Sequence, residues 1–402
     1  MRGMSLGIYI SVPFCRTKCS YCNFASDVFS KAVFEKYVDR VCTDIADSGR
    51  TAEEMGGRLE EATVDSIYLG GGTPTVLEPR QLRRMFEAVR AQFSLAARAE
   101  VTVECAPGTL SPEMLPMLAE CGVNRVSLGV QSFVDIEARA VGRLHKSTTT
   151  LDDIARLRAS GMENINIDLI AGLPHQTAES WKRSLEQTID TEAPHVSVYM
   201  LEVDEDSRLG RELIAGGTRY HAHFVPDEDA VADYYLVACE TLNAAGIAQY
   251  EISNFAQAGF ESRHNLKYWT RQPYLGFGVD AHSMLLSASG ESEAVRFASA
   301  DSLEKYIAGA PLQKTVVSRR AALEEVFFLG LRVNRGMTLR EIGTKFGQRE
   351  LQALLPIVDD LVERGLLART SDDWICLTPP GRLLSNEVFQ AFLVPVETRA
   401  GS

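Results

Sequence analysis

Hydrophobic and polar positions follow one repeating pattern from residue 7 to about residue 201. A short run rich in β-branched residues is followed by a turn with Gly or Pro, and then by a stretch of helical periodicity. This alternation predicts parallel strands joined by crossover helices. The strands are expected over residues 7–12, 64–69, 101–104, 125–129, 165–170 and 195–201.

One intervening segment, residues 30–47, shows the helical pattern clearly. Ser30 is placed to cap its amino terminus, and we expect its apolar face to pack against the sheet. That face carries Val33, Phe34, Tyr37, Val38, Val41 and Ile45.

Six β/α units in about 200 residues predict an α/β fold with a partial (β/α)6 TIM-like barrel, because the closed eight-unit form is usually larger, near 250 residues. In such a barrel the chemistry lies at the carboxyl ends of the strands. We therefore expect the functional residues directly after the predicted strands.

The rest of the chain is less regular, and we divide the whole into a core barrel over residues 1–235, an extension over 236–310 and a carboxyl-terminal domain over 311–402. In the middle part the pattern predicts a helix at 227–245, a strand at 248–252 and a Gly-rich segment at 274–280.

From residue 311 onward, helices with short turns precede a hairpin at 366–377. Gly336 and Gly365 mark the turns between these elements. This order predicts a mainly helical, winged-helix-like carboxyl-terminal domain.

Charge argues against nucleic acid as a partner. The chain has 402 residues with 41 Lys and Arg against 54 Asp and Glu, a formal charge of −13. Residues 311–402 hold 12 basic and 11 acidic residues, so the winged-helix-like part has no basic excess for phosphate contacts. A DNA-binding regulator is therefore the least favoured function, and we expect no nucleic acid partner.

The sequence also predicts a cytoplasmic protein. No uninterrupted apolar run reaches the roughly 18 residues that a membrane span needs, and the first residues lack the length and cleavage site of a signal peptide. In a reducing compartment, clustered cysteines indicate a metal site before a disulfide framework.

Three of the eight cysteines, Cys15, Cys19 and Cys22, follow the first predicted strand at spacings of four and three residues. Three thiolates on one loop fit one corner region of a 4Fe-4S cluster and leave the fourth iron open for a small chelating ligand. This is the arrangement of radical S-adenosylmethionine chemistry. A zinc site is the alternative, but no fourth Cys or His lies between Cys22 and Cys42.

Polar and Gly-rich residues follow the next four strands. The run Gly70-Gly71-Gly72-Thr73 allows close backbone approach to a ligand, and acidic side chains inside apolar strands need a partner or a ligand. Each of these residues has an ordinary structural explanation alone; together they predict a nucleoside site. The side chains concerned are Glu104, Gln131, Arg143 and Asp168.

Taken together, these motifs resemble the coproporphyrinogen dehydrogenase-like branch of the radical S-adenosylmethionine superfamily. The matching segments are Tyr9 with Pro13-Phe14-Cys15, the cysteine triplet, 70–75, 129–133, 142–143 and 168–174. The resemblance implies a radical SAM barrel in which Cys15, Cys19 and Cys22 ligate the cluster. It implies S-adenosylmethionine contacts from Tyr9, Tyr21, Gly71, Gly72, Thr73, Glu104, Gln131, Arg143 and Asp168.

Two subfamilies of this branch remain possible. Oxygen-independent coproporphyrinogen III dehydrogenases carry a fourth cysteine where this chain has Phe24, and they remove two propionate carboxyl groups by radical chemistry. The heme chaperones carry a His-Asn-x-x-Tyr-Trp motif, which stands here as His264, Asn265, Tyr268 and Trp269.

The chaperone resemblance is therefore the one we favour. It implies a bound heme with His264 as an axial ligand and with Tyr268 and Trp269 packed on the porphyrin. It further implies transfer of the heme to an acceptor such as a membrane-associated respiratory heme protein. The alternative for His264 is a hydrogen-bonded packing residue in a loop.

Overall fold

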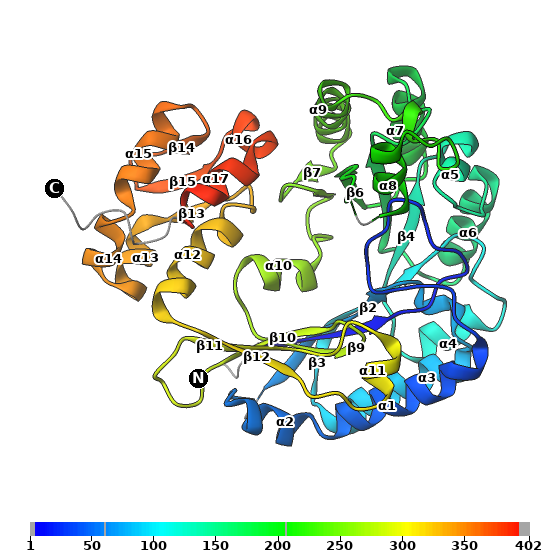
Figure 1. Cartoon of the computed structure of the whole chain (residues 1–402), viewed down its shortest axis with the longest axis horizontal. Helices are drawn as coiled ribbons and strands as arrows, with labels where there is room; N and C mark the ends of the chain where they lie inside the picture. The colour runs from blue at the N-terminus through cyan, green and yellow to red at the C-terminus, as the bar shows by residue number, and fades with distance from the viewer. Residues whose placement is uncertain (1–4, 60–61, 206, 394–402) are drawn as a thin grey trace.

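A curved mixed sheet organises the computed structural model, which describes residues 5–59, 62–205 and 207–393 (Figure 1). In this part of the chain twelve strands pair in the order β12-β11-β10-β9-β1-β2-β3-β4-β5-β6-β8-β7. The six central strands are parallel neighbours. They are β1 (Ser5–Val12), β2 (Thr63–Gly71), β3 (Leu95–Cys105), β4 (Arg125–Gln131), β5 (Ile165–Ala171) and β6 (His195–Met200).

All six predicted strands are thereby confirmed, and so is the partial (β/α)6 barrel. The sheet does not close, because β6 pairs with antiparallel β8 (Asn254–Ala256) instead of returning to β1. At the other edge β1 pairs with parallel β9 (Tyr274–Gly278). The Gly-rich segment 274–280 thus supplies a strand that its composition did not predict.

Beyond these edges the sheet continues through short antiparallel strands. The predicted strand at 248–252 is shorter than expected, since β7 covers only Ala248–Gln249. Residues 250–252 instead turn back toward β8, where the backbone N–H of Tyr250 donates to the Asn254 carbonyl. The remaining strands of the sheet are β10 (His282–Leu286), β11 (Ala294–Ala298) and β12 (Gln313–Val317).

Helices cover the outer face of the central strands. Val126, Leu128 and Val130 of β4 point outward into the main hydrophobic core, as the alternation of side chains along a strand requires. Within the described residues no helix combines the length and apolar character needed to cross a bilayer. The helices of the barrel are α1 (Phe34–Ala46), α2 (Ser48–Met55), α3 (Pro79–Gln92), α4 (Met114–Glu120), α5 (Asp135–Ala140), α6 (Ser147–Ala159), α7 (Ala178–Asp190), α8 (Arg208–Ala215) and α9 (Glu228–Ala244).

The helix expected at 30–47 is present, with a short 3-10 turn at its start. Ser30 caps that turn, Lys31–Val33, and α1 begins at Phe34. The predicted apolar face is buried against the sheet, except for Val33, which is only partly buried. The predicted segment therefore begins as a 3-10 turn and continues as an α-helix, because its first turn is wound more tightly.

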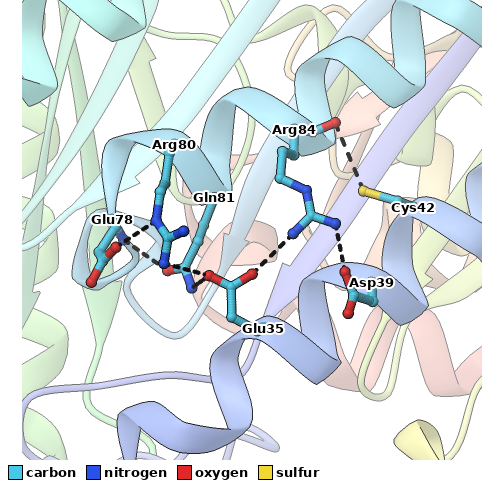
Figure 2. Close-up of polar contacts among 7 residues, drawn as sticks. All are labelled: Glu35, Asp39, Cys42, Glu78, Arg80, Gln81 and Arg84. Atoms are coloured by element: carbon cyan, nitrogen blue, oxygen red, sulfur yellow. Dashed lines mark hydrogen bonds and ion pairs between the residues drawn. The ribbon is translucent and has the colours of Figure 1, made fainter.

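Charged side chains fix how α1 and α3 lie against each other (Figure 2). Glu35 of α1 accepts hydrogen bonds from Gln81 at 2.8 Å and from Arg84 at 2.9 Å on α3. Arg80 lies 2.8 Å from the same carboxylate. Because these groups are half exposed, we expect them to orient the helices more than to stabilise them.

The carboxyl-terminal part forms its own small core beside the extension of the sheet. Its core includes Phe327, Phe346, Val358 and Phe392, and the mainly helical, winged-helix-like arrangement is confirmed. A small sheet pairs β13 (Met337–Thr338), β15 (Trp374–Leu377) and β14 (Leu367–Arg369). The helices are α12 (Arg319–Gly330), α13 (Leu339–Phe346), α14 (Gln348–Gln352), α15 (Leu355–Glu363), α16 (Pro379–Leu383) and α17 (Ser385–Ala391). The preceding helix α11 (Leu303–Ile307) packs instead in the main core, where the Tyr306 hydroxyl donates to Asp44 of α1.

One buried carboxylate ties this part to the sheet. Glu325 of α12 accepts from Arg271 Nε at 2.8 Å and from Arg296 of β11 at 2.6 Å. The side chains of Glu325 and Arg271 are 7% and 6% exposed. A buried ion pair costs most when one partner is removed, because the other charge is left without compensation.

We expect Glu325→Ala to lower the free energy of unfolding by about 3 kcal/mol, since it strands the buried Arg271 guanidinium. The neighbouring Glu324→Ala is the matched control: Glu324 pairs with exposed Arg320 at 2.9 Å and should contribute about 0.5 kcal/mol. Urea unfolding of the full chain, followed by circular dichroism, measures both. Equal losses for the two variants would contradict the buried-pair argument.

Candidate functional site

The cysteine loop follows β1 and lies at the carboxyl end of the barrel, near α8 (Figure 1). Three hydrogen bonds tie it to two neighbouring segments. The N–H of Ser20 donates to the Val141 carbonyl at 3.2 Å, the N–H of Leu209 donates to the Ser20 carbonyl at 2.8 Å, and the Thr17 hydroxyl donates to the Gly142 carbonyl at 2.8 Å. These contacts hold the loop over the open ends of the strands.

All three thiols of this loop are free. Burial raises the pKa of the Cys15 thiol, and the neighbouring Cys22 and Cys19 raise it further. The Arg143 guanidinium lies 3.7 Å from the Cys19 sulfur. No three His, Cys, Asp or Glu side chains of the described residues lie close enough to hold one metal ion; the ligands of a four-iron cluster bind three different irons.

Gly72 shows how closely the strand ends approach this loop. A Cβ at this position would lie 2.7 Å from the Phe14 carbonyl oxygen, 2.8 Å from that of Val12 and 3.1 Å from the Cys15 sulfur. Its N–H donates to Val12 and the N–H of Thr73 donates to Phe14, both at 2.8 Å. Only glycine leaves the room that the thiol and the backbone occupy.

Glu104 lies at the end of β3 beside the predicted Gly-rich run. Its carboxylate accepts from the Tyr68 hydroxyl at 2.8 Å and from the Gly71 N–H at 3.2 Å. Burial, and then the charge of Asp168, raise its pKa to about 7. Two carboxylates in one enclosed site repel each other, so a cationic ligand between them would be stabilised.

Asp168 occupies the inner face of β5. Its two oxygens accept from Ser127 at 3.0 Å and from Asn166 at 2.8 Å, and burial raises its pKa. The Asp168 carboxylate thus has hydrogen-bond partners within the barrel, and these offset the free-energy cost of burying a carboxylate in an apolar strand.

Arg143 and Gln131 meet above β4. The Arg143 guanidinium donates to the Gly129 carbonyl, and a Cβ at Gly129 would lie 2.8 Å from Arg143 and 3.1 Å from the Gln131 amide nitrogen. Gln131 takes a left-handed backbone with φ of 70°, a strained conformation that places its side chain at the strand end.

Of the other predicted nucleoside residues, Tyr9 contributes a ring to the inner face of β1. Its ring lies 6.1 Å from that of Tyr68, and its hydroxyl would lie 3.4 Å from a Cβ at Gly71. Tyr21 of the cysteine loop packs against Val141, and burial raises its pKa and that of Tyr9. The structure therefore brings the predicted residues to one end of the barrel.

The second predicted motif lies on α10 (Arg263–Trp269), on the inner side of the sheet. His264 is 1% exposed; its Nδ1 lies 3.0 Å from the Ser66 hydroxyl and its Nε2 lies 2.9 Å from the Tyr268 hydroxyl. Burial, then the charges of Lys267 and Arg125, lower its pKa to about 3. The ring is therefore neutral, and both of its nitrogens are engaged.

Trp269 points away from these two residues. The Arg332 guanidinium lies 4.3 Å from the centre of its ring, and its indole nitrogen is buried without a hydrogen-bond partner in the described residues. The structure thus brings His264 and Tyr268 together and directs Trp269 toward the carboxyl-terminal part.

Comparison with known proteins places this arrangement in a family. The model of the radical SAM superfamily matches residues 9–188, and that of the HemN C-terminal domain matches residues 317–384. The chain is 36% identical over 390 residues to the heme chaperone HemW of Bacillus subtilis (strain 168), covering 96% of this chain and 98% of that protein. This chain belongs to the HemW family.

A second relative agrees with this assignment, and a solved structure matches the fold. Heme chaperone HemW of Escherichia coli (strain K12) is 31% identical over 392 residues, covering 96% and 98% of the two chains. Coproporphyrinogen III oxidase (HemN) from Escherichia coli, a radical SAM enzyme, matches with a TM-score of 0.81 and 23% identity over 97% of this chain and 90% of that one. At that identity the solved structure shows the fold alone.

Membership of the HemW family and its radical SAM domain implies a 4Fe-4S cluster and S-adenosylmethionine. The residues present fit these groups. Three free thiols share one anchored loop, and Gly72, which has no side chain, leaves space beside Cys15. The carboxylates of Glu104 and Asp168 are suited to a cationic nucleoside ligand.

Sequence reasoning missed the residues that hold the predicted acids in place. Tyr68, Ser127 and Asn166 all donate to Glu104 or Asp168. Each lies on a central strand and faces inward, so a strict period of two could have found them. The apolar residues between these polar side chains hide the alternation, because strands that helices cover on their outer face carry many apolar residues.

We expect Gly72→Ala to lower the iron and sulfide content after anaerobic reconstitution and to destabilise the fold by about 1–3 kcal/mol, because the added methyl overpacks a backbone contact. Gly49→Ala on α2 is the control, since its Cβ would meet nothing closer than 4.0 Å and should stabilise the helix by about 1 kcal/mol. Wild-type iron content in Gly72→Ala would show that the close approach is unimportant.

The raised pKa of Glu104 predicts a pH dependence of stability. The folded protein keeps a proton on this carboxyl up to a pKa of about 7, whereas the unfolded chain releases it near 4.5. Stability from this group is therefore fully present below pH 4.5 and is lost as pH rises toward 7. In Glu104→Gln this loss, about 3 kcal/mol at most, should disappear.

Urea unfolding of the ligand-free chain at pH 5 and pH 8 measures this difference. Glu53→Gln, at an exposed position of α2, should keep the wild-type profile. An unchanged profile in Glu104→Gln would mean that another group controls the pH response.

Proposed function

We propose that this protein is a heme chaperone. It binds one heme and one 4Fe-4S cluster with exchangeable S-adenosylmethionine, and it passes the heme to an acceptor such as a membrane-associated respiratory heme protein. Cys15, Cys19 and Cys22 would hold the cluster. Tyr9, Tyr21, Gly71, Gly72, Thr73, Glu104, Gln131, Arg143 and Asp168 would hold the nucleoside.

The observation that carries this proposal is the position of α10. The ring of His264 lies 5.4 Å from that of Tyr68 and 6.3 Å from that of Tyr9, and Tyr68 in turn donates to Glu104. The motif of the heme chaperones therefore adjoins the predicted nucleoside site through two tyrosines. A heme bound at α10 would be close enough to respond to the occupancy of that site.

Iron ligation by His264 would replace one of its present hydrogen bonds. Neutral imidazole is the ligand form, and the pKa of about 3 keeps the ring neutral at physiological pH. Release of the Tyr268 hydroxyl from Nε2 would free the nitrogen for iron. Tyr268 would then remain beside the porphyrin, as would Trp269 after a shift of α10.

Phe24 separates this proposal from the enzyme alternative. It stands where the dehydrogenases carry a fourth cysteine, and its ring is 65% exposed. When bound, the cluster and S-adenosylmethionine would supply one-electron cleavage of the sulfonium bond. An apolar ring replaces a thiol at this position, so this chain lacks one group of the dehydrogenase pattern.

We expect the cluster-loaded protein to bind one heme per chain in an anaerobic titration followed by absorbance. His264→Ala should weaken heme binding by about tenfold or more, because it removes the proposed iron ligand, and should leave the cluster spectrum unchanged. His282→Ala is the control, since that imidazole is 65% exposed on β10.

Two results would contradict the proposal. Unchanged heme affinity in His264→Ala would remove the proposed ligand. Conversion of coproporphyrinogen to protoporphyrinogen with dithionite and S-adenosylmethionine would favour the alternative, an oxygen-independent coproporphyrinogen III dehydrogenase.

A further inference from the structure

Arg125 begins β4 and points into the barrel. The outward side chains of this strand, Val126 and Leu128, belong to the hydrophobic core, whereas Ser127 binds Asp168 on the inner face. By the period of two, Arg125 alternates with Val126 and takes the opposite, inner face. The side chain is 1% exposed.

This buried guanidinium has no partner in the part of the chain that the structure describes. No hydrogen bond or ion pair joins it to another described residue, and its Nε is buried without an acceptor. The contrast with Arg271 is direct, because the side chain of Arg271, 6% exposed, pairs with Glu325 at 2.8 Å. An unpaired buried charge is unfavourable, so proteins retain one where a ligand completes it.

A second unpartnered group lies beside it. Thr102 of β3 is paired in register with Arg125, is 0% exposed and has a hydroxyl without a hydrogen-bond partner in the described structure. Thr102 lies two residues from Glu104 and therefore shares its inner face. Two neighbouring strands thus direct an unsatisfied cation and an unsatisfied hydroxyl into the same part of the barrel.

The carboxylates that share this inner face, those of Glu100 and Glu104, already accept hydrogen bonds from other groups, and the charge of Arg125 acts on the histidines of the barrel. Burial and then the charge of Arg125 lower the pKa of His195, and the same charge contributes to the low pKa of His264. The charge of Arg125 lowers the pKa of Glu104 and that of Asp168, but it is the weakest of the named causes that shift these two pKa values. This part of the barrel would therefore attract an anionic group.

Distance separates Arg125 from the cluster end. Gly129 lies four residues after Arg125, about 13 Å along the strand. The carboxylate of a molecule chelated at the cysteine loop would meet Arg143 first. The anion for Arg125 must then belong to a ligand that reaches deeper into the barrel and carries its own carboxylate.

We propose that Arg125, with Thr102, binds a propionate carboxylate of the porphyrin inside the barrel. This inference rests on the proposed function and adds a second anchor to it, because His264 of α10 lies in the same inner region. A guanidinium forms two parallel charge-assisted hydrogen bonds to a carboxylate, and the Thr102 hydroxyl supplies a further donor. The porphyrin would thus be held by iron at one point and by a carboxylate at another.

Heme and heme dimethyl ester, in which both propionates are blocked, provide the test on the cluster-loaded full chain. We expect wild type to bind heme about tenfold or more tightly than the ester. Arg125→Gln should bind both ligands equally, at the affinity of wild type for the ester. Arg139→Gln, an exposed arginine on α5, should keep the wild-type preference.

Folding of the variant is checked separately. Because Arg125 has no partner in the ligand-free state, Arg125→Gln should leave the thermal midpoint of that state unchanged or higher. A lower midpoint would show that the guanidinium is a structural element of the ligand-free barrel and would overturn the proposal. Thr102→Val provides a second variant, with a smaller loss of preference for heme.

The outcomes separate this inference from the function on which it rests. If wild type and Arg125→Gln bind heme and its ester alike, the Arg125 site is wrong and the chaperone function stands. If wild type binds neither ligand, the proposed function is wrong and the propionate site is overturned with it.

Discussion

The need to satisfy polar side chains on the inner face of a parallel sheet organises this protein. The Asp168 carboxylate accepts hydrogen bonds from Ser127 and Asn166. The side-chain oxygen of Asn166 also lies 2.6 Å from a ring nitrogen of His195. The other nitrogen of His195 lies 2.9 Å from the Tyr250 hydroxyl. A single chain of hydrogen bonds therefore runs across three strands and into the segment beyond them, and each member holds the next in place.

Two regions that lie far apart in the sequence are each tied to the central strands or to the segments that follow them. At the carboxyl end, the cysteine loop is tied to the segments after β4 and β6. On the inner side, α10 is positioned by Glu100 of β3, whose carboxylate accepts from the N–H groups of Arg263 and His264 at 3.1 Å each. Tyr68 lies next to both regions, because its ring is 5.4 Å from that of His264 and its hydroxyl donates to Glu104 at the strand end.

The carboxyl-terminal part adds a third constraint on α10. Arg271, two residues beyond the helix, pairs with Glu325 of α12, and Arg332 covers the ring of Trp269. Arg332 also lies 3.8 Å from the buried carboxylate of Glu251. A movement of α10 that released His264 would therefore disturb these contacts, so the position of α10 is coupled to the carboxyl-terminal part.

The sequence alone determined the strand order of the central sheet, the cysteine loop and the residues at the strand ends. These are local or periodic properties: spacing places three thiols on one loop, and alternation of strands and helices requires a parallel sheet. The sequence did not determine that Tyr274–Gly278 forms a strand beside β1, because its glycines have low strand propensity. Pairing with β1 and β10 and a hydrogen bond to Ser283 stabilise it. Nor did the sequence reveal that both nitrogens of His264 are engaged or that Arg125 has no partner in the described structure. Those facts depend on which side chains the fold brings within hydrogen-bond distance, and residues separated by more than a hundred positions decide them, as Ser66 does for His264.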